Sequence, residues 1–310
     1  MAGAAAAACA SPSSAADVAT SHLATPSATR AVLEAHGLSL KKSLGQHFLI
    51  DDDIVRKIIE LSAPAPDCAV LEIGPGIGTL TVALCDTAGA VVAVERDADL
   101  LPVLEDVAAA CGNLTVVRAD AVAVDPGALM TPLGPPVALI ANLPYAVAAT
   151  VVLRMFEEVP SLLSATVMVQ AEVAARMAAD PGRKDYGAYT VKLRLYAEPA
   201  GSFGVPRSCF MPPPHVDSTV LRLDRVERSE DDAARASVKY LVEAAFSQRR
   251  KTLRNAVLAS TGWSGALFDE ALAETGVDGR RRAETLSVDE FVELASAAAR
   301  LGLRDCKLGL

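Results

Sequence analysis

The sequence is poor in the residues that build metal centres and disulfide frameworks. It has 4 histidines, and its 6 cysteines are scattered, with no CxxC pair and no histidine cluster beside them. A structural zinc site and a disulfide framework are therefore not expected, and this cysteine usage fits a reducing cytoplasm. Long hydrophobic runs are also missing, since no apolar stretch approaches the ~20 residues of a membrane-spanning helix. We expect a cytoplasmic protein with no bound metal and no membrane partner.

Basic residues are absent from the beginning of the chain. Residues 1–24 form a tract rich in Ala, Ser and Thr, without Lys or Arg. A secretory signal needs a positive segment followed by a proper hydrophobic region, and neither is present. We predict a disordered leader over residues 1–24, because its composition is typical of low-complexity segments.

An excess of positive charge is missing as well, which by itself argues against a nucleic-acid partner. The formal net charge is −9 over 310 residues. The distribution is uneven, however: residues 245–256 contain four basic residues and no acid, and residues 176–207 contain six basic residues against three acids. Local basic segments suffice to contact a phosphate backbone, although such runs are as often simply solvated surfaces. The four in the first segment are Arg249, Arg250, Lys251 and Arg254.

The hydrophobic content of 51% is sufficient for a full α/β domain and a smaller companion. Short apolar runs alternate with helical patterns, which favours a mostly parallel sheet with helices on both faces, a Rossmann-like domain over residues 25–225. The expected strands cover residues 69–73, 90–94, 114–117, 137–141 and 165–169. Two later segments, 191–196 and 219–223, are predicted as strands that finish the sheet in antiparallel fashion.

The pattern changes beyond Arg225, where only helical spacing remains. Val238, Leu241, Val242 and Ala245 form one apolar stripe. We predict a small C-terminal helical domain over residues 229–305 and place Arg250, Lys251 and Arg254 on the same helix, away from the stripe.

A glycine-rich segment follows the first strand. Residues 72–78 read Glu-Ile-Gly-Pro-Gly-Ile-Gly, and glycines such as Gly74 and Gly76 let a backbone approach a ligand at the carboxyl end of a sheet. Glu95, at the end of the second strand, is placed to accept hydrogen bonds from two ribose hydroxyls. The alternative is a plain glycine turn with a surface glutamate. The run lacks the third glycine of the GxGxxG pattern of dinucleotide-dependent oxidoreductases, so a cofactor without a pyrophosphate is favoured.

Two polar positions at the ends of later strands complete this candidate site. Asp120 would meet the adenine amino group of such a cofactor, or else it caps a turn. Asn142-Leu143-Pro144-Tyr145 directly follows the fourth strand. Together with the GPGIG run, this tetrapeptide resembles the methyltransferases that act on the N6 amine of adenine. The resemblance implies S-adenosylmethionine as cofactor.

The tetrapeptide suits this chemistry because an exocyclic adenine amine is a weak nucleophile. The Asn142 side-chain oxygen and the Leu143 carbonyl could each accept one N–H, which localises the nitrogen lone pair. Pro144 fixes the turn, and Tyr145 offers a face on which the base stacks, worth roughly 1–3 kcal/mol. Positioning and oriented dipoles then do most of the work, and no metal is required.

Three further segments resemble the KsgA-type family of small-subunit ribosomal RNA adenine N6-dimethyltransferases. The first, LGQHFL at residues 44–49, implicates His47 and Leu49 in binding the methionine part of the cofactor. The second, FMPPPHVDS, begins at Phe210, which the resemblance places over the target adenine opposite Tyr145. The third, FSQRRKTLRN at residues 246–255, carries the basic residues that would contact RNA. The similarity runs from about residue 41 to 291, with departures at His47, where the family often has Asn, and at Ala146, where it often has a polar residue.

This resemblance implies dimethylation of two adjacent adenines in the 3′-terminal hairpin of 16S ribosomal RNA, within the small ribosomal subunit. We expect a monomer. Two alternatives remain open: a large-subunit adenine dimethyltransferase of the antibiotic-resistance type, and a ribosome-assembly factor whose catalysis is secondary or lost.

Overall fold

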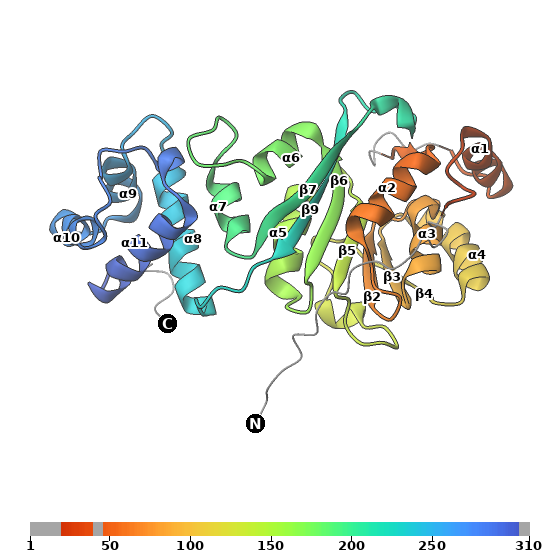
Figure 1. Ribbon diagram of the computed structural model, residues 1–310, viewed down its shortest axis with the longest axis horizontal. Helices are drawn as coiled ribbons and strands as arrows, with labels where there is room; N and C mark the ends of the chain where they lie inside the picture. The colour runs from red at the N-terminus through yellow and green to blue at the C-terminus, as the bar shows by residue number, and fades with distance from the viewer. Residues whose placement is uncertain (1–19, 40–45, 304–310) are drawn as a thin grey trace.

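The computed structural model describes residues 20–39 and 46–303. Figure 1 shows two parts side by side, a sheet flanked by helices and a bundle of helices at one end of the molecule. No helix in the described part of the chain is long and apolar enough to cross a membrane. The same residues contain no cluster of His, Cys, Asp and Glu that could hold a metal ion.

The larger part is built on a seven-stranded sheet in the order β4-β3-β2-β5-β6-β9-β7. The first five strands of this order are parallel, and β9 runs antiparallel to both of its neighbours. Their bounds are β2 Ala69–Ile73, β3 Ala90–Glu95, β4 Leu114–Arg118, β5 Ala138–Asn142, β6 Ser164–Gln170, β7 Ala197–Val205 and β9 Ser218–Arg225. After β2 the chain adds β3 and β4 on one side of it, and then crosses to add β5 on the other side. The strand order therefore reverses between β2 and β5. Ligands of open α/β sheets bind outside the carboxyl ends of the strands at such a point.

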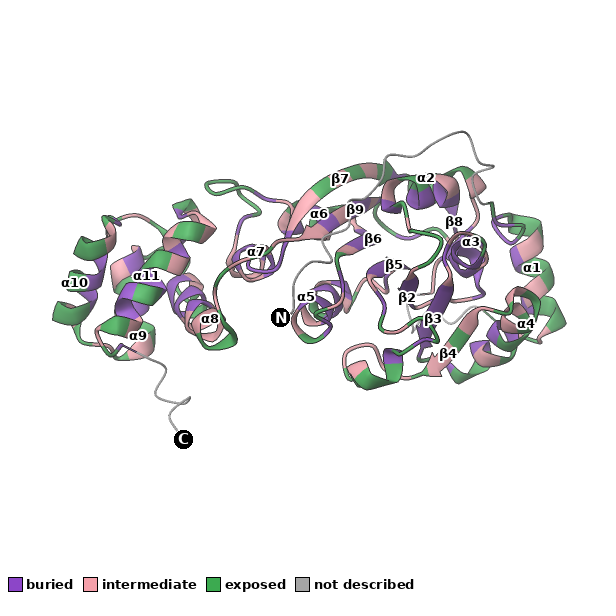
Figure 2. Ribbon diagram, turned by 60° about the horizontal axis from the view of Figure 1, so that its bottom comes forward, coloured by how far each residue is buried: buried purple, intermediate pink, exposed green. Residues whose placement is uncertain are grey.

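Alternating side chains of the buried strands pack into two separate hydrophobic layers, one on each face of the sheet. Val70 packs with α2 and α3 on one face, whereas Leu71 packs with α5 and α7 on the other. Figure 2 shows β2 and β3 almost wholly buried between these layers. The helices are α1 Pro26–Ala35, α2 Asp52–Ser62, α3 Thr79–Thr87, α4 Leu101–Cys111, α5 Ala148–Glu158, α6 Ala171–Met177 and α7 Ala188–Arg194. The predicted fold class is confirmed.

One predicted strand is wrong and one strand was missed. Residues 191–196 lie mostly in α7, where Thr190, Val191 and Leu193 are buried against the core. The actual strand is β7, which follows immediately and contains Pro199, Gly201 and Gly204. These residues argue against a strand, but β7 is an edge strand with β9 as its single neighbour, and its register shifts between Pro199 and Gly201. Edge strands and bulges tolerate both residue types.

The described chain beyond β9 contains only helices and their connections. They are α8 Asp232–Phe246, α9 Leu253–Thr261, α10 Gly265–Thr275 and α11 Val288–Arg300. The prediction that Arg250, Lys251 and Arg254 share the helix of the apolar stripe is wrong. That helix, α8, ends at Phe246, so residues 249–251 lie in the α8–α9 connection and Arg254 lies on α9.

The fold begins before residue 25. Leu23 and Ala24 are buried, and the Ser21 backbone N–H donates to Asp52 at 2.6 Å. Of these residues, which the sequence placed in the leader, Ser21 thus contacts the start of α2 and Ala24 packs in the cluster that contains α2. Residues 1–19 lie outside the described part of the chain.

Candidate active site

The glycine-rich loop after β2 is shaped by left-handed backbone angles. Gly74, Gly76 and Gly78 have φ values of +71°, +62° and +86°. A Cβ added to Gly74 would lie 3.3 Å from Pro144 Cδ, and one added to Gly76 would lie 3.1 Å from Phe48 Cε1. Larger residues would therefore be strained and crowded at both positions. The loop is packed directly between two other segments that the sequence singled out.

The carboxylate of Glu95 is held at the end of β3 by backbone donors. Its Oε1 accepts N–H bonds from Arg96 and Asp97, both at 2.8 Å, and its Oε2 accepts a longer one of 3.4 Å from Gly76. The side chain is 7% exposed, and burial raises the pKa of this carboxyl against the effect of the three donors. Oε2, with only one long contact, keeps the capacity to accept hydrogen bonds from a ribose.

Asp120, at the end of the neighbouring strand, is already engaged. Its Oδ1 accepts the Val122 N–H at 3.1 Å, and its Oδ2 lies 3.3 Å from Arg96 Nη1. It therefore caps its turn, which is the structural role weighed from the sequence. Contact with a cofactor adenine stays a prediction for this residue.

Unpaired buried polar atoms lie on both sides of the glycine loop, at the end of β2 and at the start of α3. Glu72 Oε2 and Thr79 Oγ1 have no hydrogen-bond partner among the described residues, and the two residues are 1% and 5% exposed. Burial raises the pKa of Glu72 to about 8, the neighbouring Thr81 hydroxyl opposes the shift, and the nearby Glu95 adds to it. Buried polar groups normally have partners. Vacant donors and acceptors beside a close-approach loop fit a cofactor that carries a ribose and an amino-acid group.

The Asn142 amide is oriented by the segment that precedes β1 (Phe48–Leu49). Asn142 lies at the end of β5, and its Nδ2 donates to the His47 backbone carbonyl at 3.3 Å. This contact uses the nitrogen and leaves Oδ1 as an acceptor. The following residue, Leu143, is 1% exposed, and its N–H donates to the Met168 carbonyl at 3.1 Å.

Tyr145 is anchored at both ends of its side chain. Its hydroxyl lies 2.7 Å from Ser218 Oγ, and its ring stacks on the His47 imidazole with centroids 5.8 Å apart at 23°. Burial raises the pKa of Tyr145, although the Ser218 contact opposes the shift. The phenol is therefore neutral at physiological pH. The ring is held in a fixed position by these two contacts.

A two-stranded sheet joins the first and second family-like segments. Strand β1 pairs with β8 (Phe210–Met211), with Leu49 opposite Phe210, and His47 Nδ1 lies 2.7 Å from the Pro212 carbonyl oxygen. Residues 44 and 45 of the first segment lie outside the described residues. Phe210 is 2% exposed and packs in the core layer that also contains Leu49. Covering the target adenine requires it to leave that packing, and this role stays a prediction.

The basic residues of the third segment divide into two kinds. Arg249, Arg250 and Lys251 are exposed and make no ion pair with any described residue. Arg254, in contrast, donates to both carboxylate oxygens of Asp269, at 2.6 and 2.8 Å. Its charge is thus already paired within the helical bundle.

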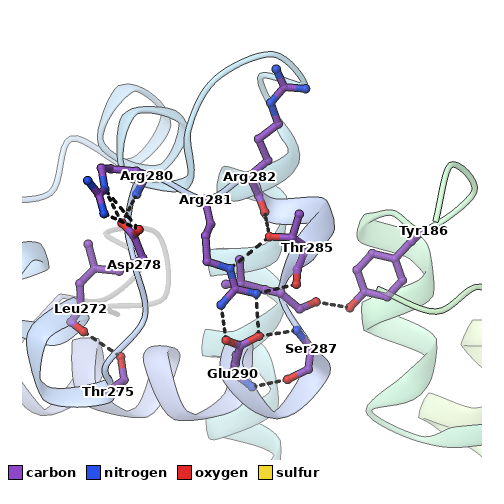
Figure 3. A network of polar contacts seen from close by, with 11 residues as sticks. Tyr186, Leu272, Thr275, Asp278, Arg280, Arg281, Arg282, Thr285, Ser287 and Glu290 are labelled. Carbon is purple, nitrogen blue, oxygen red and sulfur yellow. Dashed lines mark hydrogen bonds and ion pairs between the residues drawn. The ribbon is translucent and has the colours of Figure 1, made fainter. Parts of the chain in front are cut away.

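Sequence reasoning missed a second basic segment beside the first. Residues 280–282 are three consecutive arginines, a signal that was visible in the sequence. Figure 3 shows Arg280 paired with Asp278, Arg281 paired with Glu290, and Arg282 directed away from both. The Arg282 side chain is 56% exposed, with a single weak contact to Glu284 at 3.9 Å.

Comparison with known proteins places these features in a family context. A sequence model described as ribosomal RNA adenine dimethylase matches residues 37–300. The chain is 42% identical over 281 residues to the ribosomal RNA small subunit methyltransferase A of Shouchella clausii (strain KSM-K16), covering 89% of this chain and 95% of that protein. It is 39% identical over 285 residues to the protein of the same name from Geobacillus sp. (strain WCH70), covering 89% and 97%.

Two solved structures also resemble the chain. A dimethyladenosine transferase from Plasmodium falciparum superposes with a TM-score of 0.72 at 26% identity, covering 84% of this chain and 100% of that one. The 23S rRNA methyltransferase ErmE superposes with a TM-score of 0.63 at 28% identity, covering 81% and 98%.

Proposed function

The chain belongs to the ribosomal RNA adenine dimethylase family, and from this premise we propose that it dimethylates two adjacent adenines near the 3′ end of 16S ribosomal RNA. The cofactor is S-adenosylmethionine, and the substrate is the small ribosomal subunit. The observation that carries the proposal is the convergence of three segments on one point: Asn142 donates to His47, Tyr145 stacks on His47, and His47 contacts Pro212.

The cofactor supplies a methyl group on a sulfonium, which is an electrophile that needs no metal. This chain's own residues bind and orient it: Glu95 accepts from the ribose, and Gly74 and Gly76 let the backbone approach. Asn142 Oδ1 and the Leu143 carbonyl accept the two N–H groups of the target amine. That arrangement directs the nitrogen lone pair at the methyl carbon, so that alignment rather than acid–base chemistry lowers the barrier.

The target base must leave its stack to reach these acceptors, at a cost of a few kcal/mol. The fixed ring of Tyr145 offsets part of this cost by stacking. A monomethylated amine retains one N–H, so one of the two acceptors can hold it for the second transfer while the other is released. Arg249, Arg250 and Lys251 are free to contact RNA phosphates, whereas Arg254 would have to exchange Asp269 for a phosphate.

Two alternatives differ from this proposal, one in the ribosomal RNA that is methylated and the other in having no methyl transfer. Similarity to ErmE favours a large-subunit adenine as the second candidate, but its 28% identity is well below the 42% and 39% shared with the small-subunit relatives. An assembly factor without chemistry would not need the acceptor at Asn142. Transfer of labelled methyl groups to separated, unmodified subunits tests the choice, and label found only on the large subunit would overturn it.

Replacement of Asn142 tests the chemistry itself. Asn142→Ala removes one of the two acceptors, so transfer to small subunits should fall by about 10²–10³, the usual cost of losing one oriented polar group in an active site. Asn142→Asp keeps an acceptor oxygen and should lose less. Single-turnover rates at saturating cofactor measure both. Wild-type transfer by the alanine variant would show that the amide has no part in the reaction.

A further inference from the structure

We propose that the α6–α7 connection, residues 178–187, extends the RNA-binding surface of the helical bundle onto the sheet domain. In this arrangement Arg183 and Lys184 join Arg282 and residues 249–251 in one basic strip that contacts the backbone of a folded RNA. The inference rests on the proposed function and identifies how the same RNA is held across both parts of the molecule.

The α6–α7 connection is fixed to the helical bundle rather than projecting freely. The Gly182 N–H donates to the Glu284 carbonyl at 2.7 Å, and the Tyr186 hydroxyl donates to the Leu286 carbonyl at 2.8 Å. Tyr186 is 5% exposed, so this second contact lies inside the junction. Figure 3 shows Tyr186 reaching from the sheet domain to the segment that follows Arg282. Arg183 and Lys184 lie between these two anchor points.

The arginine segment is in turn fixed to the start of α9. The Leu253 N–H donates to the Arg281 carbonyl at 2.7 Å, and the Arg254 N–H donates to the Gly279 carbonyl at 3.1 Å. Residues 249–251 immediately precede this contact. Backbone hydrogen bonds therefore connect the three basic segments in sequence across the domain junction.

Most charges of the strip have no acidic partner among the described residues, and Arg282 has one weak contact, with Glu284 at 3.9 Å. Arg183 and Lys184 are exposed and, like residues 249–251, form no ion pair within the described part of the chain. Two acids adjoin them: Asp180 lies 3.7 Å from Arg194, and Asp185 is exposed with no basic partner. Because the chain as a whole carries −9, a polyanion is repelled by most of the surface and attracted to a local basic strip.

The location favours RNA that is continuous with the target hairpin. In Figure 1 the α6–α7 connection, the loops at the start of α9 and the β7–β9 connection lie along the same edge of the molecule. In the proposed arrangement, an RNA backbone held by the strip follows this edge toward the β7–β9 connection. Such contacts fix register without reading sequence.

The test is binding of the full-length protein to unmethylated small ribosomal subunits over a range of salt concentrations. In Arg183→Gln/Lys184→Gln, the slope of log K against log salt should decrease by about two, since each phosphate contact contributes about one. The affinity should fall roughly tenfold at moderate salt. Asp185→Asn should instead raise the affinity, a gain that misfolding cannot produce.

A matched control removes two positive charges from the opposite end of the molecule. Arg30 on α1 and Arg118 on β4 are exposed and lie far from the helical bundle in Figure 1. Arg30→Gln/Arg118→Gln should bind with the wild-type slope. Unchanged binding of the Arg183/Lys184 variant would overturn the proposed role of the strip. An equal loss of affinity in the control would overturn it too. If wild-type protein neither binds nor methylates small subunits, the proposed function fails instead.

Discussion

His47 is the residue through which the three parts of the candidate site contact one another. Its backbone carbonyl receives the Asn142 amide, its ring stacks on Tyr145, and its Nδ1 lies 2.7 Å from the Pro212 carbonyl oxygen. The sequence suggested contact with the cofactor for this residue. The structure adds contacts through which it orients the Asn142 amide and the Tyr145 ring.

Replacing His47 separates these two roles. An aromatic pair is worth about 0.5–1.5 kcal/mol, or about two- to twelvefold in rate. His47→Ala should therefore slow single-turnover transfer several-fold at saturating cofactor. His47→Phe keeps a ring on Tyr145 and should retain more of the rate, with cofactor affinity followed by calorimetry. Equal rates in the two variants, together with equally weakened cofactor binding, would assign His47 to the cofactor alone.

Glu72 makes the stability of the fold depend on pH. Its pKa is raised from 4.5 to about 8, chiefly by burial. Between these values the folded state binds more protons than the unfolded state, so the free energy of unfolding falls as pH rises. Each unit of pKa displacement corresponds to about 1.4 kcal/mol. Glu72→Gln removes the titration. The Tm of the variant minus the Tm of the wild type should therefore increase from pH 5 to pH 8. A constant Tm difference would show that Glu72 does not titrate in this range.

At the scale of elements, the sequence identified the central strands because their signals are local. Continuous apolar runs mark β2 and β3. The error at residues 191–196 arose because β-branched and aromatic residues suggested a strand where tertiary packing selects a helix. The missed strand β7 is held by its pairing with β9, which no local pattern contains.

In the candidate site, too, some residues can be predicted from the neighbouring sequence and others depend on contacts between distant segments. Gly74, Glu95 and Asn142 follow from their positions at strand ends, since parallel strands bring those ends to one edge. The pairing of Leu49 with Phe210 joins residues about 160 positions apart, so neighbouring sequence cannot predict it. The burial of Phe210 and the pairing of Arg254 with Asp269 likewise depend on the assembled fold.

At the scale of the molecule, the helical bundle and the sheet domain are parts of one structure. A single hydrophobic cluster extends from Leu71 in the sheet to Leu241 and Phe291 in the bundle. Lys239 on α8 lies 2.6 Å from Glu157 on α5, and its ammonium sits 5.1 Å from the centroid of the Tyr196 ring. Because the junction is packed and polar contacts cross it, basic residues on both sides keep a fixed spacing.

Two tyrosines provide a matched test of whether this fixed junction serves RNA binding. The Tyr186 hydroxyl donates to Leu286 across the junction, whereas the Tyr189 hydroxyl donates to Ala149 within the sheet domain, at 3.0 Å. Tyr186→Phe and Tyr189→Phe each lose one hydrogen bond to a backbone carbonyl, so each should lower the free energy of unfolding by about 1 kcal/mol in urea titrations. Only Tyr186→Phe removes one of the two hydrogen bonds that anchor the segment carrying Arg183 and Lys184 to the bundle. It should therefore also reduce the salt dependence of small-subunit binding, while Tyr189→Phe should not. Equal binding by the two variants would mean that the spacing of the basic segments across the junction does not matter to the RNA.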